Sequence, residues 1–473
     1  TLPDLGGTPG YSQDSAAKLA AGTATIYHNQ RLGNELAAIK AANPTINIVT
    51  VPVVTLEAAI LANPGAFGIT NTSAACLDKT TGTVCASTRA GQNSYFFWDD
   101  VHPTTGTHAL IAQAARIMTT GAEAATRSAD SQGDAGMLLS RAMDRDVGDR
   151  LRRLHDGAVG SRISMAALTL GGIGPQLAAA GGYPGATLAE APADIERPFA
   201  MFASGGWQTA RLDAASDRTG LSQDGATIAI GGDWRPLPDL ALGLAAGYGS
   251  GDVSLKGNGG SFDLAAWRLT AYAAYTRPSW YVDGTLGHAW LGFDDIRRNT
   301  GFGGMATSGE TDGRAVTASL GSGYRLSRGN ATFGPVAGLR WTRLSVGAYS
   351  ETGGFGLGQR WDRQTADALS GELGVEAILH HRFRGTVVEP RLRLAWEPMI
   401  EDGRRNVRAR LLDNTADAVS AGARGLGDAV SVEAGLDARL AGGASLGIAY
   451  QGSWELQAGG ASHRVAAHLA VKF

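Results

Sequence analysis

The chain has 473 residues, 67 of them glycine, and a formal net charge of −3 at pH 7. Its mean hydropathy is −0.07, and no window of about 18 residues is uninterruptedly apolar, which excludes helical membrane spans. The near-neutral charge provides no basic field and argues against nucleic acid as a partner. A chain this long predicts two domains joined by a linker.

Residues 1–120 show a partial α/β pattern. Apolar residues at helical spacing lie within 32–39 and 56–61, and residues 46–53 read as a buried strand. An amphipathic helix is expected at 105–118. Helices and strands alternate as in α/β domains, but too few strands are expected to make a full sheet.

The two cysteines, Cys76 and Cys85, lie close together in a polar loop. Such a pair predicts a disulfide and an oxidising compartment. A metal site is the alternative, although two cysteines without nearby histidines make a poor zinc site. An exported protein should begin with a signal peptide, and none precedes the first polar residues after Thr1. We therefore expect the chain to be processed or incomplete at its start.

A possible catalytic pair precedes the helix expected at 105–118. Asp99 stands three residues before His102 in a loop, so its carboxylate can orient the imidazole and support its positive charge, as two members of a Ser-His-Asp triad do. The alternative is that Asp99 and Asp100 cap a turn and His102 is an ordinary loop histidine.

The block at 98–104, WDDVHPT, resembles the last conserved block of the GDSL (SGNH) esterase/lipase family, and most closely its autotransporter members. LPDLG at 2–6 and NPGAFG at 63–68 extend the resemblance over about residues 1–120. It implies an SGNH-hydrolase-like passenger that cleaves carboxylic esters without a metal or organic cofactor. By this resemblance His102 is the general base and Asp99 its orienting partner.

The other blocks of that family are missing, including the Gly-Asp-Ser of the nucleophile and the Gly-x-Asn-Asp block. We expect them upstream of Thr1. Four serines of the segment sit in no recognisable nucleophile turn and read as surface residues: Ser12, Ser15, Ser73 and Ser94. A base without a nucleophile loses the covalent route, so this chain alone should hydrolyse esters negligibly.

Residues 121–194 read as a linker. The small residues of 119–136 predict a flexible connector, and a helix of mixed charge is expected at about 137–156, with Asp146 and Arg150 at i, i+4 spacing. That helix is either solvated or threads a polar barrel, and the GDSL autotransporters resemble the second arrangement. Residues 171–192 read as a mobile segment.

From 195 to 473 a period of two predicts β-strands. One face of a strand at 264–275 carries Trp267, Leu269 and Tyr275, and the other carries Arg268, Thr270 and Tyr272. In the last strand Arg464, His468 and Lys472 alternate with apolar residues. A soluble sandwich would accept such strands, but a transmembrane barrel needs them throughout, with a lipid-facing exterior and a mixed-charge lumen.

The connections between these strands alternate in length. Short turns are expected at 236–239, 277–279, 327–330, 380–385 and 441–443, and longer loops at 213–222, 250–261, 297–310, 350–363, 401–427 and 457–462. This pattern gives about twelve antiparallel strands. Tryptophans near the strand ends fit interfacial girdles: Trp207, Trp234, Trp280, Trp290, Trp341, Trp396 and Trp454.

Residues 195–473 resemble the autotransporter translocator domain, and the terminal Phe473 resembles the sorting signal of bacterial outer-membrane proteins. The resemblance implies a monomer in the outer membrane, with lipid, the barrel assembly machinery and an ester substrate as partners and the N-terminal domain at the cell surface. We predict an autotransporter esterase. The alternative is a barrel that serves as an anchor or a pore and carries a degenerate passenger.

Overall fold

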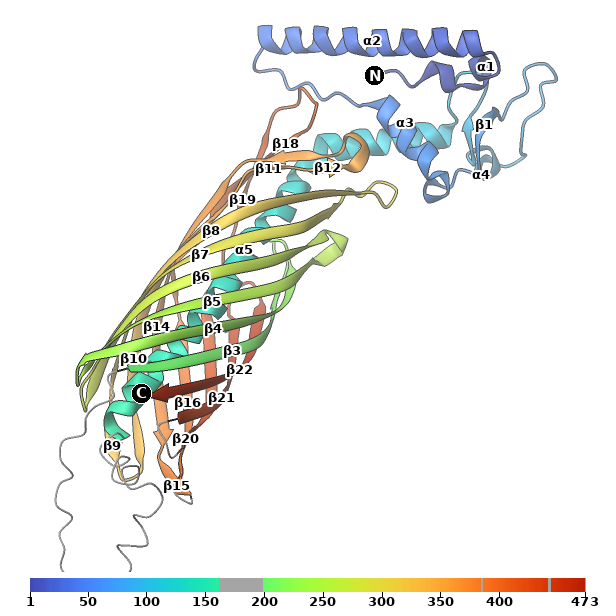
Figure 1. Ribbon diagram of the computed structural model, residues 1–473. Helices are drawn as coiled ribbons and strands as arrows, with labels where there is room; N and C mark the ends of the chain where they lie inside the picture. Colours follow the sequence, from blue (N-terminus) through green and yellow to red (C-terminus); the bar gives the residue numbers. More distant parts are fainter. Residues whose placement is uncertain (161–198, 384–385, 441–443, 473) are drawn as a thin grey trace, which may run out of the picture.

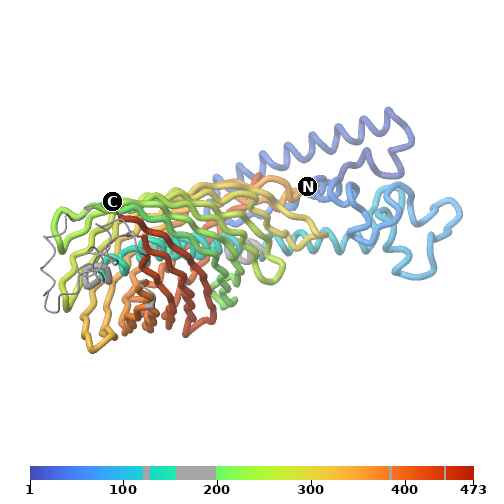
Figure 2. The backbone as a smooth tube through the Cα atoms, turned by 60° about the horizontal axis from the view of Figure 1, so that its bottom comes forward, coloured from blue at the N-terminus to red at the C-terminus, as the bar shows by residue number. Residues whose placement is uncertain are grey.

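The computed structural model describes residues 1–160, 199–383, 386–440 and 444–472. A small N-terminal unit sits at one end of a β-barrel (Figure 1). One long helix leaves this unit and runs inside the barrel, as Figure 2 also shows. Within the described residues, no helix combines the length and apolar character that crossing a membrane requires.

The N-terminal unit consists of helices and a two-stranded parallel sheet. Its elements are η1 (Leu5–Gly7), α1 (Pro9–Ser12), α2 (Ser15–Ala42), α3 (Val53–Ala62), η2 (Pro64–Phe67), β1 (Asn71–Ala75), α4 (Arg89–Gln92) and β2 (Tyr95–Phe97). The sequence pattern misses β1 and β2 because both are short and β1 is made of small and polar residues. Two strands are too few to identify the SGNH fold, which stays a prediction.

The strand predicted at 46–53 is wrong. Residues 46–52 form no strand, because side chains of a barrel loop take their backbone hydrogen bonds instead. Asn414 bonds both backbone groups of Thr50, at 3.1 and 2.7 Å, and the Thr415 hydroxyl donates to the Ile48 carbonyl at 2.8 Å. This segment therefore attaches the N-terminal unit to the barrel.

Helix α5 (Thr105–Gly160) is 56 residues long, so the flexible connector predicted at 119–136 is wrong. Alanine, the best helix former, recurs through this stretch. Two of its glycines allow close packing: a β-carbon would lie 2.5 Å from Arg405 Nε at Gly133 and 2.9 Å from Leu344 Cδ2 at Gly136. The helix predicted at 137–156 is part of α5, whereas residues 171–192 lie outside the described residues.

Twelve antiparallel strands among the described residues close into the barrel, which confirms the predicted architecture. They are β3 (Phe199–Leu212), β4 (Leu221–Leu237), β5 (Leu240–Leu255), β6 (Gly260–Thr276), β7 (Trp280–Asn299), β8 (Ala306–Tyr324), β10 (Ala331–Val346), β14 (Gln364–Leu379), β16 (Thr386–Glu397), β20 (Ala429–Arg439), β21 (Ala444–Glu455) and β22 (Gly460–Lys472). Each pairs with the next, and β22 pairs with β3. A closed sheet leaves no unpaired edge in the wall.

The two ends of the barrel differ, as the alternation of connections predicts. The end with the connections 238–239 and 277–279 is the turn end. The opposite, loop end carries the longer connections 213–220, 347–363 and 398–428. Short elements lie in these and other connections between the barrel strands: η4 (Lys256–Asn258), β9 (Leu326–Arg328), β11 (Tyr349–Ser350), β12 (Thr352–Gly353), η5 (Gly354–Gly356), β13 (Gln359–Trp361), β15 (His381–Phe383), β17 (Met399–Asp402), β18 (Arg405–Leu411) and β19 (Val419–Ala423).

The long loops predicted at 250–261 and 457–462 are wrong. The flanking strands continue through most of the first region and half of the second, so the connections shrink to 256–259 and 456–459. Ser250 and Gly251 pair with Ala226 and Gly225 of β4. Small residues that read as a loop are thus strand residues whose backbone groups bond across the sheet.

Side chains of the wall alternate between the outside and the lumen, as predicted. Trp267 and Leu269 are exposed on the outside of β6, while Arg268 and Thr270 between them are buried in the lumen. In β22, Val465 and Leu469 are exposed whereas Arg464 and His468 are buried. Phe473 lies outside the described residues.

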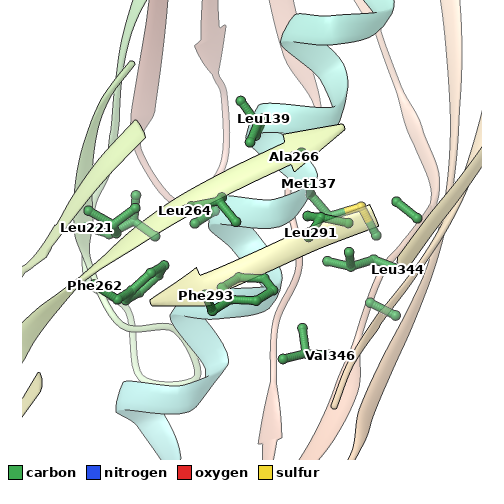
Figure 3. Close-up of a cluster of buried hydrophobic side chains, with 14 of the residues drawn as sticks. Met137, Leu139, Leu221, Phe262, Leu264, Ala266, Leu291, Phe293, Leu344 and Val346 are labelled. Carbon is green, nitrogen blue, oxygen red and sulfur yellow. The ribbon is translucent and has the colours of Figure 1, made fainter. Parts of the chain in front are cut away.

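The predicted mixed-charge lumen is only partly right, because its loop-end half contains an apolar core (Figure 3). Met137 and Leu139 of α5 belong to the same buried cluster as inward side chains of the wall: Leu221, Phe262, Leu264, Leu291, Phe293, Leu344 and Val346. Burial of apolar area stabilises such a cluster at about 25 cal/mol per Å². Helix α5 is therefore held in the barrel by hydrophobic packing as well as by charge.

Candidate functional site

The predicted catalytic pair lies in a narrow loop between β2 and α5. The backbone of Trp98 donates to the His102 carbonyl at 2.7 Å, and Thr104 donates to Phe96 at 3.0 Å. Two further bonds close the turn, because the Asp99 carboxylate accepts from the backbone N–H groups of Val101 at 2.9 Å and His102 at 2.8 Å. These bonds fix the Asp99 carboxylate beside the His102 ring.

Asp99 and His102 form a hydrogen-bonded dyad. His102 Nδ1 lies 3.0 Å from each Asp99 carboxylate oxygen. The His102 side chain is 73% exposed and that of Asp99 only 12%. Burial alone would raise the pKa of Asp99, but hydrogen bonds from the backbone of His102 and Val101, and then from the side chains of His102 and Lys79, hold that pKa well below its ordinary value. An ionised Asp99 favours the tautomer that leaves Nε2 free to accept a proton.

Asp100 and His108, two polar residues near the dyad, make other contacts. The Asp100 carbonyl accepts from the Gly10 N–H at 2.8 Å, so this residue joins α1 to the dyad loop. His108 Nδ1, in the first turn of α5, lies 3.1 Å from the carbonyl of Thr104, the residue before the helix. Neither residue bonds to the dyad. Sequence reasoning missed Lys79, whose ammonium lies 3.4 Å from Asp99; its position between the two cysteines was the available signal.

Residues 1–118 supply no hydroxyl that hydrogen-bonds to the His102 ring. The Ser94 hydroxyl donates to the Gly91 carbonyl at 2.8 Å, and the Ser12 hydroxyl accepts from the Gln13 side-chain amide at 3.5 Å. The described part of the chain also brings no three His, Cys, Asp or Glu side chains together as metal ligands. The polar site described in this segment is the hydrogen-bonded pair of Asp99 and His102.

The structure joins Cys76 and Cys85 by a disulfide, which closes the polar loop of residues 77–84.

A cavity of about 530 Å³ lies between the N-terminal unit and the barrel loops. Its lining includes Asn29, Thr50, Glu351 and Asn414 but neither member of the dyad.

Charged side chains of α5 face the barrel wall. Asp146 and Arg150, at i, i+4 spacing, have separate partners on the wall: Asp146 pairs with Arg464, and Arg150 lies 2.6 Å from Asp233. Further pairs between α5 and the wall include Asp144 with Arg268, Asp149 with Arg464 at 3.5 Å, Arg152 with Glu433 at 2.9 Å and Arg153 with Asp437 at 3.3 Å. Near the loop end, Asp134 pairs with Arg405 of β18 at 3.0 Å. Opposite charges of the helix and the wall thus lie next to each other inside the barrel.

A closed antiparallel wall with an apolar outside and a buried, charged inside defines a transmembrane β-barrel protein. Residues 199–451 match the family described as the autotransporter beta-domain. The chain belongs to this family, whose β-barrels are outer-membrane proteins.

Curated relatives are similar over part of the chain. It is 26% identical to an uncharacterised protein of the trpE–trpG intergenic region of Pseudomonas putida, over 46% of this chain and 36% of that protein. It is also 26% identical to esterase EstA of Pseudomonas aeruginosa, over 34% of this chain and 26% of that protein. The chain thus spans about a third or less of the length of these relatives.

Solved autotransporter barrels are similar as well. The translocator domain of NalP from Neisseria meningitidis is 15% identical, with a TM-score of 0.48, and the match covers 59% of this chain and 90% of that structure. The β domain of the Bordetella autotransporter BrkA is 20% identical, with a TM-score of 0.45, and the match covers 58% of this chain and 100% of that structure.

Proposed function

We propose that this protein is a carboxylic-ester hydrolase of the GDSL (SGNH) type that its own barrel anchors at the cell surface. The observation that carries the proposal is the dyad, in which Asp99 is ionised and held 3.0 Å from the ring of an exposed His102. The similarity to esterase EstA supports the same class.

His102 is the general base of the proposed reaction. It accepts a proton at Nε2 from the attacking serine hydroxyl, which forms a bond to the ester carbonyl carbon, and returns that proton to the leaving alcohol. Water then hydrolyses the acyl-enzyme with the same base. Asp99 stabilises the imidazolium at both stages. The serine is expected from the family's Gly-Asp-Ser block, for which residues 1–118 offer no candidate.

The contacts of the N-terminal unit support its placement outside the cell. Phe67 packs against Phe302 of the barrel with ring centroids 5.1 Å apart, and Lys40 lies 2.7 Å from Asp417. Both partners belong to connections at the loop end. Outer-membrane barrels direct their longer loops outward and their short turns to the periplasm.

The proposal is tested on intact cells that express the protein from its own gene. We expect hydrolysis of p-nitrophenyl butyrate, reduced about 10²–10⁴-fold by His102→Ala, since a general base contributes about that much. His108→Ala is the matched control, because the His108 ring lies 3.1 Å from the backbone carbonyl of Thr104 and bonds to neither Asp99 nor His102. Equal rates for native protein and His102→Ala would refute the role of His102.

The alternative of an open pore makes a different prediction. Because α5 fills the lumen with apolar and paired charged side chains, we expect the native barrel to conduct poorly in planar bilayers. A variant that lacks residues 128–155 should conduct strongly if it still folds. Its folding is checked by gel electrophoresis, in which an unheated, folded barrel migrates differently from a heated, unfolded sample. High conductance of the native protein would favour the pore.

A further inference from the structure

The disulfide-closed loop lies directly against the strand that leads to the dyad. The backbone N–H of Cys76 donates to the Phe97 carbonyl at 3.1 Å, and that of Leu77 donates to the Trp98 carbonyl at 2.7 Å. These bonds continue the parallel pairing of β1 and β2 up to the residue before Asp99. The start of the loop is thereby fixed relative to the catalytic carboxylate.

The loop is also tied internally. Cys85 N–H donates to the Cys76 carbonyl at 2.7 Å, alongside the disulfide. The Asp78 carboxylate accepts from the backbone of Thr80 at 2.8 Å and from the Thr81 hydroxyl at 2.9 Å. A short covalent loop with these bonds has few alternative conformations, so the residue after Asp78 has a defined position.

That residue is Lys79, whose Nζ lies 3.4 Å from Asp99 Oδ2 and 3.5 Å from Asp100 Oδ2. The backbone donors of the turn bond to the other oxygen of Asp99, Oδ1. Burial would lower the pKa of Lys79, but the bonds and charges of Asp99 and Asp100 raise it overall. The ammonium therefore stays protonated beside the dyad.

We propose that Lys79 is a positioning residue of the dyad, which the Cys76–Cys85 loop holds against Asp99. It has two effects. Its N–H group helps to fix the carboxylate plane, and its positive charge opposes protonation of His102, so that the base stays neutral and active to lower pH. Asp100 shares the ammonium and moderates both effects. The catalytic meaning of this contact rests on the proposed function, but the contact itself does not.

The test follows the His102 ring by NMR across a pH titration of the folded full chain in detergent, with the signal assigned through His102→Ala. Lys79→Gln should move the titration midpoint of His102 up by about 0.5 pH units, as expected for loss of one charge beside a solvent-exposed pair. Lys79→Arg should restore the native midpoint. Replacing both Cys76 and Cys85 with alanine should move it in the same direction as Lys79→Gln.

Lys40→Gln is the matched control, because Lys40 forms a comparable surface pair with Asp417 far from the dyad in sequence. The control should leave the midpoint unchanged. The inference is overturned if Lys79→Gln moves the midpoint by less than about 0.1 pH units, or if Lys79→Arg behaves like Lys79→Gln. If Lys79 acted only through the shape of its side chain and not through its charge, Lys79→Arg would not restore the native midpoint.

Ester hydrolysis separates this inference from the proposed function. In an active enzyme, the acid limb of the pH profile of kcat/KM should move with the NMR midpoint. A shifted midpoint in a protein without esterase activity would support the contact and refute the hydrolase. Hydrolysis that depends on His102 but keeps its acid limb in Lys79→Gln would support the hydrolase and refute the role of Lys79.

Discussion

Asp99 and Asp100 are adjacent carboxylates with different surroundings, which makes them a matched pair. Asp99 accepts bonds from two backbone N–H groups and from His102, whereas the Asp100 side chain is half-exposed and has an ion pair with Lys79. Asp99→Asn would place an amide where the ring needs an acceptor and favour the wrong tautomer. We expect ester hydrolysis to fall about 10²–10⁴-fold in Asp99→Asn and less than about threefold in Asp100→Asn. Equal losses in the cell-surface assay would contradict the assigned roles.

Glu57 makes the N-terminal unit sensitive to pH. Its buried carboxylate accepts from the Asp4 N–H at 2.6 Å. Burial raises the pKa of Glu57 from 4.5 to about 7, the Asp4 N–H opposes this, and the Asp4 carboxylate adds to it. Between these values the folded state binds more protons than the unfolded state. The stability contributed by this difference is thus fully present below pH 4.5 and is lost as the pH rises through about 7.

Glu57→Gln should remove this dependence. At pH 8 the variant should be more stable than the native protein by on the order of 3 kcal/mol, and at pH 4.5 by little. The measurement is amide hydrogen exchange of residues 53–62 in the full chain. Dividing the exchange rate of the variant by that of the native protein at the same pH removes the intrinsic pH dependence of amide exchange. Glu35→Gln, on the exposed surface of α2, is the control, and an equal gain in that variant would contradict the assignment to Glu57.

At the scale of elements, α5 connects the N-terminal unit to the lumen without interruption. Arg464 of β22 is 1% exposed and contacts both Asp146 and Asp149 of the helix. Arg464→Leu would leave two buried carboxylates without this partner, and removing one side of a buried pair costs about 3–5 kcal/mol. We expect that loss of unfolding free energy in urea titrations followed by tryptophan fluorescence in lipid vesicles.

An exposed pair provides the control for Arg464. Arg408 of β18 lies 3.8 Å from Asp362 at the protein surface. Exposed pairs contribute at most about 1 kcal/mol, so Arg408→Leu should change stability by no more than that. Equal losses of unfolding free energy in Arg464→Leu and Arg408→Leu would contradict the view that burial strengthens the pairs in the lumen.

The continuity of α5 was not predictable from the pattern of small residues. Glycine and alanine between 119 and 136 are typical both of flexible linkers and of close helix packing. Whether such residues form a linker or a packed helix depends on what contacts them. At Gly133 and Gly136 the contacts come from Arg405 of β18 and Leu344 of β10, more than 200 residues away in sequence. Sequence spacing identified the dyad because its members are three residues apart. It missed Lys79 because only the folded loop brings that residue to Asp99.

At the scale of the whole molecule, the outer surface of the barrel is layered. Towards the turn end, Tyr275 and Trp280 have ring centroids 5.6 Å apart. Towards the loop end, Tyr248, Trp267 and Trp290 are directly paired across β5, β6 and β7. The eight residues from Tyr275 to Trp267 span roughly 20 Å along the barrel axis at about 3.3 Å per residue and a tilt near 40°. This distance suits the apolar band of an outer-membrane barrel.

A row of carboxylates marks the upper limit of this band. Asp224, Asp252, Asp263 and Asp294 are exposed and follow one another across β4 to β7 in register. They stand four residues beyond the aromatic row, where like charges remain solvated rather than enter hydrocarbon. The strands at the loop end therefore continue beyond the lipid.

Most of this architecture was predictable because it is local. Alternating side chains and tryptophans near strand ends report the lipid-facing surface directly, as Trp267 beside Arg268 illustrates. The apolar core of the lumen was not predictable in this way. Phe262 and Leu264 face inward while Asp263 between them is exposed, so at the loop end of β6 the period of two persists, but the apolar residues lie on the inner face. Only contact with α5 distinguishes them from lipid-facing residues.

The layered surface predicts how charge is tolerated along one strand. Leu244 of β5 is 70% exposed and pairs with Ala271, midway between the two aromatic rows, whereas Ser254 lies on the same face beyond Asp252. Leu244→Arg should lower the unfolding free energy in lipid vesicles by about 2–4 kcal/mol, because it places a cation near the bilayer midplane, while Ser254→Arg should cost at most about 1 kcal/mol. Urea titrations of both variants provide the comparison. Equal, small effects would mean that this face meets water and not hydrocarbon, and the barrel would then lose its role as the membrane anchor.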